Sequence, residues 1–264
     1  MSGNDLKAAA EAAFLHQGGR TVVFEHAGRR HVAKRLAEKP RRLIQTLFMR
    51  WLVKRITGQP LPLNTLALST AAHSMDFEAR RLQTLAAAQV RVPQLCLQTA
   101  DFFVLEHCGT VIATLLESWQ RDTWRQELER LVVELAEFHR AGHWHGGAQI
   151  KNITQQNGQN YRIDFEENFG EFLPLTVTQA ADLMLFLNSI SLAGPIDEAE
   201  ARELLPQLIE HYFAVHPDAG IKQVIQRTVP LMQKIAACTD LFSRWSRKGI
   251  RRIRIMVDIL SEVR

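Results

Sequence analysis

The sequence predicts an α+β protein with two lobes, a small β-rich lobe followed by a mostly helical one. Short apolar runs that are typical of strands are concentrated before residue 107, and long amphipathic runs that are typical of helices follow Thr110. One further short strand pair is expected near 152–164. A chain of 264 residues is long enough to bury a sizeable core in both parts. We therefore expect an N-lobe over 1–108 and a helical C-lobe over 109–264.

The first lobe is expected to begin with a helix and a β-hairpin. The alternation over 21–26 and 30–36 predicts two strands, joined at Ala27 and Gly28. Gly18 and Gly19 precede the first strand, where they form either a plain turn or a place for backbone amides to approach a ligand.

A helix is expected over 74–88 and two strands over 91–97 and 102–106. In the second lobe one long apolar face runs from Trp124 to Phe138, and Gly142 is expected to end its helix. Further helices are expected over 177–192, 198–213, 219–237 and 249–262.

Composition sets the class of protein and its expected compartment. Cys96, Cys108 and Cys238 are odd in number and far apart, so they indicate neither a disulfide framework nor a zinc site, and a reducing compartment is expected. The N-terminus lacks the apolar core of a signal peptide, and no apolar run approaches the roughly 20 residues of a membrane span. We expect a cytoplasmic protein, or one peripheral on the inner face of a membrane.

Lys34 and Glu78 form the first candidate pair. Lys34 lies on the second hairpin strand, where it is either a solvated lysine or a point charge for phosphate groups. Glu78 shares a helix face with Leu82 and Leu85, and a carboxylate on an apolar face needs a counter-charge because burying it alone costs several kcal/mol. We therefore predict a Lys34–Glu78 pair, against the alternative that Glu78 lies at a water-exposed rim.

Asn152 and Asp164 are the strongest candidates for a metal site. They are twelve residues apart, after a His-Gly loop and within an Ile-Asp-Phe segment. Mg²⁺ prefers a few carboxylate or carbonyl oxygens together with phosphate oxygens, so one Asp and one Asn suffice. The structural alternatives are a turn residue and a helix cap.

Asp182 and three histidines are expected to support this loop. Asp182 lies in an otherwise apolar helical stretch, so its carboxylate must accept several hydrogen bonds, and the backbone of the 143–149 loop would supply them. His139, His143 and His145 lack the spacing and partners of a zinc site, which favours a loop-stabilising role for them.

These residues resemble the small atypical kinases, in particular the kinase subunit of the KEOPS complex with its bacterial relatives and the lipopolysaccharide core (Kdo/heptose) kinases. The resemblance covers most of 14–190, and Asp182 follows Asp164 by only eighteen positions, which is too short for the activation segment of regulated protein kinases. It implies a protein-kinase-like two-lobed fold, ATP and Mg²⁺ as cofactors, and metal binding by Asn152 and Asp164. It further implies nucleotide-binding roles for the residues of the first lobe and its end, which are Gly18, Gly19, Lys34, Glu78, Glu106 and Cys108.

Gly147 departs from the family pattern, because it occupies the position of the catalytic Asp. A glycine neither accepts the proton of an acceptor hydroxyl nor orients it. Positioning and electrostatics supply most of phosphoryl transfer, so activity can survive this loss, with Glu166, His145 or Gln149 orienting the acceptor. The predicted catalytic set is Asp164, Asn152, His145 and Glu166, and the alternative is a nucleotide-binding pseudokinase.

The acceptor is expected to be a sugar hydroxyl of the lipopolysaccharide type or a protein Ser/Thr. Basic segments at 41–55 and 244–254 predict contact with an anionic membrane or with lipopolysaccharide phosphates, although solvated helix faces explain them equally well. Nucleic acid ranks third as a partner, since no aromatic-interleaved RNA-reading motif accompanies the basic residues.

Overall fold

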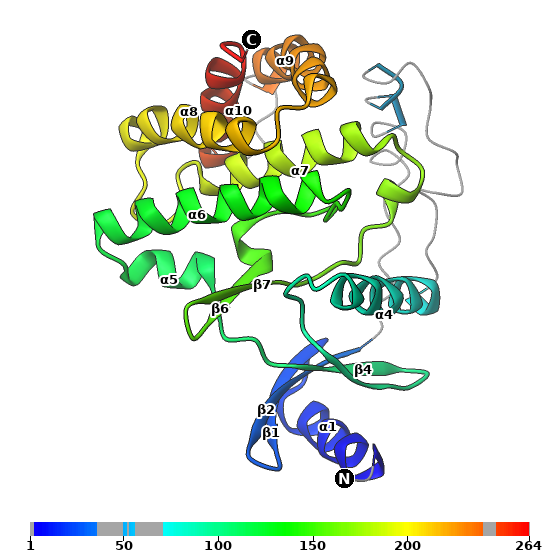
Figure 1. Cartoon of the computed structure of the whole chain (residues 1–264). Helices are drawn as coiled ribbons and strands as arrows, with labels where there is room; N and C mark the ends of the chain where they lie inside the picture. The colour runs from blue at the N-terminus through cyan, green and yellow to red at the C-terminus, as the bar shows by residue number, and fades with distance from the viewer. Residues whose placement is uncertain (1–2, 36–49, 52, 56–70, 240–246, 264) are drawn as a thin grey trace.

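The computed structural model describes residues 3–35, 50, 51, 53–55, 71–239 and 247–263, and these form two lobes (Figure 1). The smaller lobe contains an antiparallel sheet of order β1-β2-β4-β3, with the helix α1 before it in the sequence and the helix α4 between β2 and β3. Its elements are α1 (Gly3–Gln17), β1 (Thr21–His26), β2 (Arg29–Arg35), α4 (Ala71–Ala87), β3 (Leu95–Gln98) and β4 (Phe102–Glu106). The predicted α+β, two-lobed class is confirmed.

The helix α1 covers one face of this sheet and gives the lobe its own small core. Its apolar side chains Leu6, Ala10, Ala13 and Phe14 recur on one face and pack against buried residues of the strands. Phe14 meets the Phe102 ring edge to face, with ring centroids 5.5 Å apart. This core holds the hairpin β1–β2, and with it Lys34, against the rest of the lobe.

The larger lobe is mostly helical and contains a second, small sheet of order β5-β6-β7. Its helices stack away from the first sheet, and the C-terminal helices lie at the far end (Figure 1). The elements are β5 (Thr110–Val111), α5 (Ile112–Ser118), α6 (Arg121–Arg140), η1 (Ile150–Asn152), β6 (Ile153–Gln156), β7 (Gln159–Arg162), η2 (Phe169–Glu171), α7 (Leu175–Ile190), α8 (Glu198–Val215), α9 (Ala219–Thr239) and α10 (Arg247–Leu260).

The end of α6 sets the entry into the loop that follows it. Gly142 adopts a φ of +81°, its N–H donates to the carbonyl of His139, and the next N–H, from His143, donates to the carbonyl of Phe138. These two bonds form a Schellman motif, which glycine accommodates without steric cost. The predicted stop at Gly142 is confirmed.

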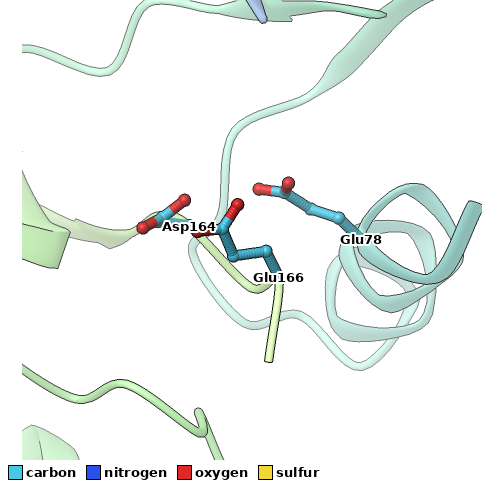
Figure 2. Close-up of side chains that lie close together, drawn as sticks. All are labelled: Glu78, Asp164 and Glu166. Atoms are coloured by element: carbon cyan, nitrogen blue, oxygen red, sulfur yellow. The ribbon is translucent and has the colours of Figure 1, made fainter. Parts of the chain in front are cut away.

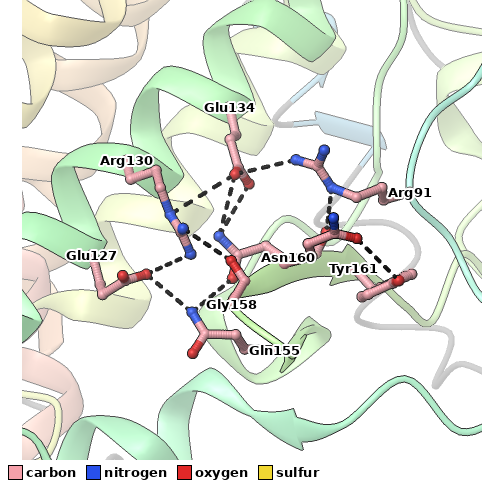
Figure 3. A network of polar contacts seen from close by, with 9 residues as sticks. Arg91, Glu127, Arg130, Glu134, Gln155, Gly158, Asn160 and Tyr161 are labelled. Carbon is pink, nitrogen blue, oxygen red and sulfur yellow. Dashed lines mark hydrogen bonds and ion pairs between the residues drawn. The ribbon is translucent and has the colours of Figure 1, made fainter.

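A polar network on the outside of α6 fixes the hairpin β6–β7, which leads to Asp164 (Figure 3). Asn160 donates to both oxygens of Glu134 at 3.2 and 3.3 Å, and Gln155 donates to Glu127 at 3.0 Å. Arg130 donates to the carbonyl of Gly158 at 3.0 Å. The hairpin is therefore anchored at its turn and along its length, so the segment after β7 starts from a defined position.

Two predicted strands are shorter than expected. The strand expected over 91–97 begins at Leu95, because Pro93 cannot donate to a strand ladder. The strand expected to carry Asp164 ends at Arg162, and Asp164 itself has a φ of +68°, outside the β region.

The basic segments are only partly within the described residues. Of 41–55, residues 50, 51 and 53–55 are described and helical, with the side chain of Trp51 47% exposed, and the rest lies outside them. Of 244–254, residues 247–254 are described and lie in α10, whose Arg251 pairs with Glu198 at 3.0 Å. No helix in the described ranges is long and apolar enough to cross a membrane.

Candidate functional site

Lys34 lies near the end of β2 and points toward α4. Its Nζ donates to both carboxylate oxygens of Glu78, at 2.8 and 3.1 Å. Glu78 is only 2% exposed, so the lysine supplies the counter-charge that a buried carboxylate requires. The predicted ion pair is present, and it joins the sheet to the helix α4.

Asp164 and Glu166, which belong to the larger lobe, also contact Lys34. Lys34 Nζ lies 2.5 Å from Asp164 Oδ1 and 3.6 Å from Glu166 Oε2, and Figure 2 shows Glu78, Asp164 and Glu166 close together. Burial lowers the pKa of Lys34, but the attraction of Glu78, Asp164 and Glu166 outweighs burial and raises that pKa above its ordinary value. Burial also raises the pKa of Asp164, yet Lys34 holds it below its ordinary value. Both groups are therefore charged at neutral pH.

Arg20 is a site residue that the sequence interpretation missed. Its Nη2 donates to Glu166 Oε2 at 2.7 Å, and its carbonyl accepts from the N–H of Arg35 at 2.8 Å. It directly precedes Thr21, the residue that pairs with Lys34 across the β1–β2 ladder. The sequence offered no signal for it, because neighbours along a strand point to opposite faces and the hairpin register alone does not place Arg20 beside Lys34.

The carboxylates fit a divalent cation. Oxygens of Glu78, Asp164 and Glu166 all lie within 4.8 Å of one another, and these form the only cluster of three or more His, Cys, Asp or Glu side chains so placed among the described residues. Oxygen donors are the ligands that Mg²⁺ prefers, and the side chain of Asp164 is 35% exposed, so an ion can reach it.

Asn152, the other predicted metal ligand, ends the short helix η1 and is buried. Its Nδ2 donates to the carbonyl of Gly147 at 2.9 Å. Since the amide nitrogen is engaged by the loop, Oδ1 is the atom that would serve as a ligand.

Asp182 fixes the loop before Gly147, as predicted. Its carboxylate, on α7, accepts from the N–H of His145 at 2.6 Å and from that of Gly146 at 2.9 Å. Burial raises the pKa of Asp182, but its hydrogen bonds and the nearby histidines lower it overall. Gly146 has a φ of +87°, and an added Cβ would meet Glu167 at 3.1 Å, so a glycine is required here.

Two of the three histidines of this region, His139 and His145, are buried, whereas His143 is partly exposed. His139 contacts the Tyr212 hydroxyl at 2.6 Å and lies 3.5 Å from Asp182, while His145 stacks on Phe165 with ring centroids 4.3 Å apart. Burial lowers the pKa of His145 to about 4 and also lowers the pKa of His139. Both are therefore neutral at pH 7, and their contacts match the predicted loop-stabilising role.

Gly147 has no side chain that could orient an acceptor hydroxyl. Its N–H donates to Nδ1 of His145 at 3.2 Å. Among the three substitutes considered, His145 is 1% exposed, Glu166 is paired with Arg20 and Lys34, and Gln149 is partly exposed. Gln149 is therefore the substitute whose side chain is not already held by an ion pair or by burial.

A second contact missed by the sequence interpretation joins α4 to the loop. The Arg81 guanidinium lies over the Trp144 ring, 4.3 Å from its centroid, and donates to the carbonyl of Trp144 at 2.7 Å. Phe77 stacks on the same ring with centroids 6.3 Å apart. Because Glu78 follows Phe77, this contact couples the position of the ion pair to that of the loop.

The remaining predicted nucleotide contacts lie before the start of β1 and at or beyond the end of β4. Gly18 and Gly19 connect α1 to β1 with φ values of +69° and +84°, and the N–H of Gly18 closes the helix on Phe14. Glu106 ends β4 with an exposed side chain, whereas Cys108 is buried, and burial raises the pKa of its thiol to about 12. Their roles toward a nucleotide stay predictions.

Comparison with solved structures finds chains that are similar in structure. Neither a protein-family model nor a curated protein matches the sequence. Among solved structures, a MAP kinase from Leishmania major is similar at 14% identity and a TM-score of 0.37, over 96% of this chain and 82% of that chain. The geometry of the site therefore carries the functional conclusion.

Proposed function

We propose that this protein is an ATP- and Mg²⁺-dependent phosphotransferase of the kinase type. The observation that carries the proposal is the position of Lys34 Nζ, 2.8 Å from Glu78 on α4 and 2.5 Å from Asp164 on the other lobe. A lysine held by a helical glutamate beside a metal-binding aspartate is the arrangement that places and neutralises nucleotide phosphates in kinases.

In this proposal each residue has one role. Lys34 donates to phosphate oxygens, and Glu78 keeps its ammonium group in place. Asp164 and Oδ1 of Asn152 hold the metal, which when bound neutralises charge on the phosphates. Asp182 keeps the backbone of His145 and Gly146 fixed, so that the loop presents a constant surface to the acceptor.

The acceptor is proposed to be a hydroxyl of a lipopolysaccharide-type sugar or of a protein Ser/Thr side chain. Gln149 supports this reading, since it is partly exposed two residues beyond Gly147 and carries both a donor and an acceptor.

A second function, a nucleotide-binding pseudokinase, is favoured by Gly147. Position 147 lacks the carboxylate that normally takes the proton of the acceptor hydroxyl. The ion pairs around Lys34 do not depend on that carboxylate. Such a protein would bind Mg-ATP without transferring phosphate and would act as a scaffold or regulator.

The test is phosphate transfer from labelled Mg-ATP to core lipopolysaccharide, to a Ser/Thr peptide mixture and to the protein itself. Native protein and Asp164→Ala are compared, with Glu210→Gln, an exposed change on α8, as the matched control. Transfer that Asp164→Ala abolishes and Glu210→Gln leaves intact supports the enzyme. Nucleotide binding without transfer supports the pseudokinase, and the absence of both contradicts the proposal.

A further inference from the structure

Two cations, Lys34 and Arg20, face the carboxylates of this site. Lys34 pairs with Glu78 and Asp164, while Arg20 pairs with Glu166, whose carboxylate also lies 3.6 Å from Lys34. With two positive and three negative side chains, the cluster has a formal charge of −1. It therefore repels a metal-free polyphosphate and attracts a divalent cation.

The backbone fixes where Arg20 starts. Its carbonyl accepts from Arg35 N–H at 2.8 Å and its Nε donates to the carbonyl of Arg35 at 3.3 Å, which continues the β1–β2 ladder by one residue. The guanidinium then crosses to Glu166, 146 residues further along the chain. Arg35 is directed elsewhere, with its guanidinium over the Phe14 ring, 4.1 Å from the centroid. Arg20 is thus held in the site at both ends.

We propose that Arg20 is a second phosphate-binding side chain, and that Glu166 is the counter-ion that holds it in place until phosphate groups enter. This inference rests on the proposed nucleotide binding. When Glu166 joins Asp164 and Asn152 around a divalent cation, Arg20 loses its counter-ion, while Lys34 keeps Glu78 alone. Both side chains can then donate to phosphate oxygens. Arginine suits this role because its planar fork of donors matches two phosphate oxygens at once.

Replacement of Glu166 by phosphate as the partner of the cations accounts for the two ion pairs that Glu166 makes, with Arg20 and with Lys34. Besides its contact with Arg20, the Glu166 carboxylate lies 3.6 Å from Lys34 and within 4.8 Å of the other acids, so it stands between both cations and the cation site. At that place it competes with phosphate for both cations in the absence of metal. Binding of the nucleotide should therefore depend strongly on the metal, and Glu166 should be one cause of that dependence.

The experiment measures the affinity for a non-hydrolysable ATP analogue by calorimetry, with Mg²⁺ and with EDTA, in the full chain. We expect Arg20→Met to weaken Mg-nucleotide binding roughly 10- to 100-fold, the effect of losing a charge-assisted contact, and Arg20→Lys to recover part of it. Glu166→Gln should strengthen metal-free binding and reduce the ratio between the two conditions. Arg227→Met and Glu210→Gln, exposed changes on α9 and α8, are the matched controls. Thermal unfolding verifies that each variant is folded.

The outcomes separate this inference from the proposed function. If the native protein binds Mg-nucleotide and folded Arg20→Met binds it within twofold, Arg20 is not a phosphate ligand while the proposed function stands. If Glu166→Gln changes affinity equally with and without metal, its counter-ion role is wrong. If the native protein and both controls bind no nucleotide at millimolar concentration, the proposed function itself fails.

Discussion

The nucleotide half of the site and its acceptor half are built in opposite ways. The nucleotide half, which comprises Arg20, Lys34, Glu78, Asp164 and Glu166, consists of charged side chains that meet across the two lobes. The acceptor half, the 143–149 loop, is held through its backbone, whose amides donate to the buried carboxylate of Asp182 and whose Trp144 carbonyl accepts from Arg81.

This difference separates binding from transfer. Ion pairs around Lys34 give a nucleotide the charges it needs whatever residue occupies position 147. The loop determines only whether an acceptor hydroxyl is oriented next to the phosphate. Changes in the first half should therefore alter affinity and stability, and the change at Gly147 should alter transfer alone.

The largest effect is expected from Lys34→Met, which leaves the carboxylate of Glu78 buried without its partner. Such a change costs about 3 to 5 kcal/mol of unfolding free energy and removes most Mg-nucleotide affinity. Denaturant titration and calorimetry measure the two effects. The double variant Lys34→Met with Glu78→Gln should recover stability but not binding, and recovery of both would mean that Lys34 does not contact the nucleotide.

The second effect is a loss of stability in mild acid that originates in the acceptor half. Burial lowers the pKa of His145 to about 4 from its ordinary 6.5, so its contribution is complete above pH 6.5 and is lost as the pH falls toward 4. That shift corresponds to about 3 kcal/mol for a group that is 1% exposed. The lowered pKa of His139 acts in the same direction.

Thermal unfolding between pH 8 and pH 4.5 measures this loss, and His145→Asn, which keeps an acceptor for the N–H of Gly147, should flatten the curve. Over the same range the raised pKa of Lys34 keeps that residue charged, so the nucleotide half should not titrate through it. An identical pH profile for the native protein and His145→Asn would contradict the assignment.

A smaller effect is expected from Asp182→Asn, since one oxygen remains to accept from the loop. The loss should be about 2 to 3 kcal/mol of unfolding free energy, the value of hydrogen bonds to a charged group. Mg-nucleotide affinity should fall less than stability, because Lys34 and Glu78 do not touch Asp182. A collapse of affinity at unchanged stability would show that the two halves are not separable.

The smallest effect on stability is expected from Gly147→Asp. Gly147 lies outside the left-handed region, and an added Cβ would meet only Asn152 Nδ2 at 3.4 Å and His145 Nδ1 at 3.8 Å. Unfolding free energy and nucleotide affinity should stay within about 0.5 kcal/mol of the native values. The rate of transfer to an acceptor hydroxyl should rise by about 100-fold or more, because a general base is restored. An unchanged rate in a protein that already transfers phosphate would assign the role to another side chain.

Local pattern was sufficient for much of the fold and for half of the site. The apolar spacing from Trp124 to Phe138 predicted α6, and Gly142 predicted its end, because these features depend only on neighbours in sequence. Lys34, Glu78 and Asp182 were predicted because a charge on an apolar face demands a partner whatever the fold. That demand is visible in sequence, and the structure supplies Lys34 for Glu78 and two backbone amides for Asp182.

Only the tertiary structure decided how the parts meet. The pairing of Arg20 with Glu166 and the stacking of Arg81 on Trp144 join residues 146 and 63 positions apart. Glu166 was a candidate in the sequence, but nothing in its own segment indicated Arg20 as its partner. Asp164 has a positive φ, and its carboxylate lies 2.5 Å from Lys34 of the other lobe, neither of which its neighbours in sequence indicate. The sequence by itself thus determined which charges had to be neutralised. The packing of the two lobes determined which partners neutralise them, since that depends on distances in space that local sequence does not encode.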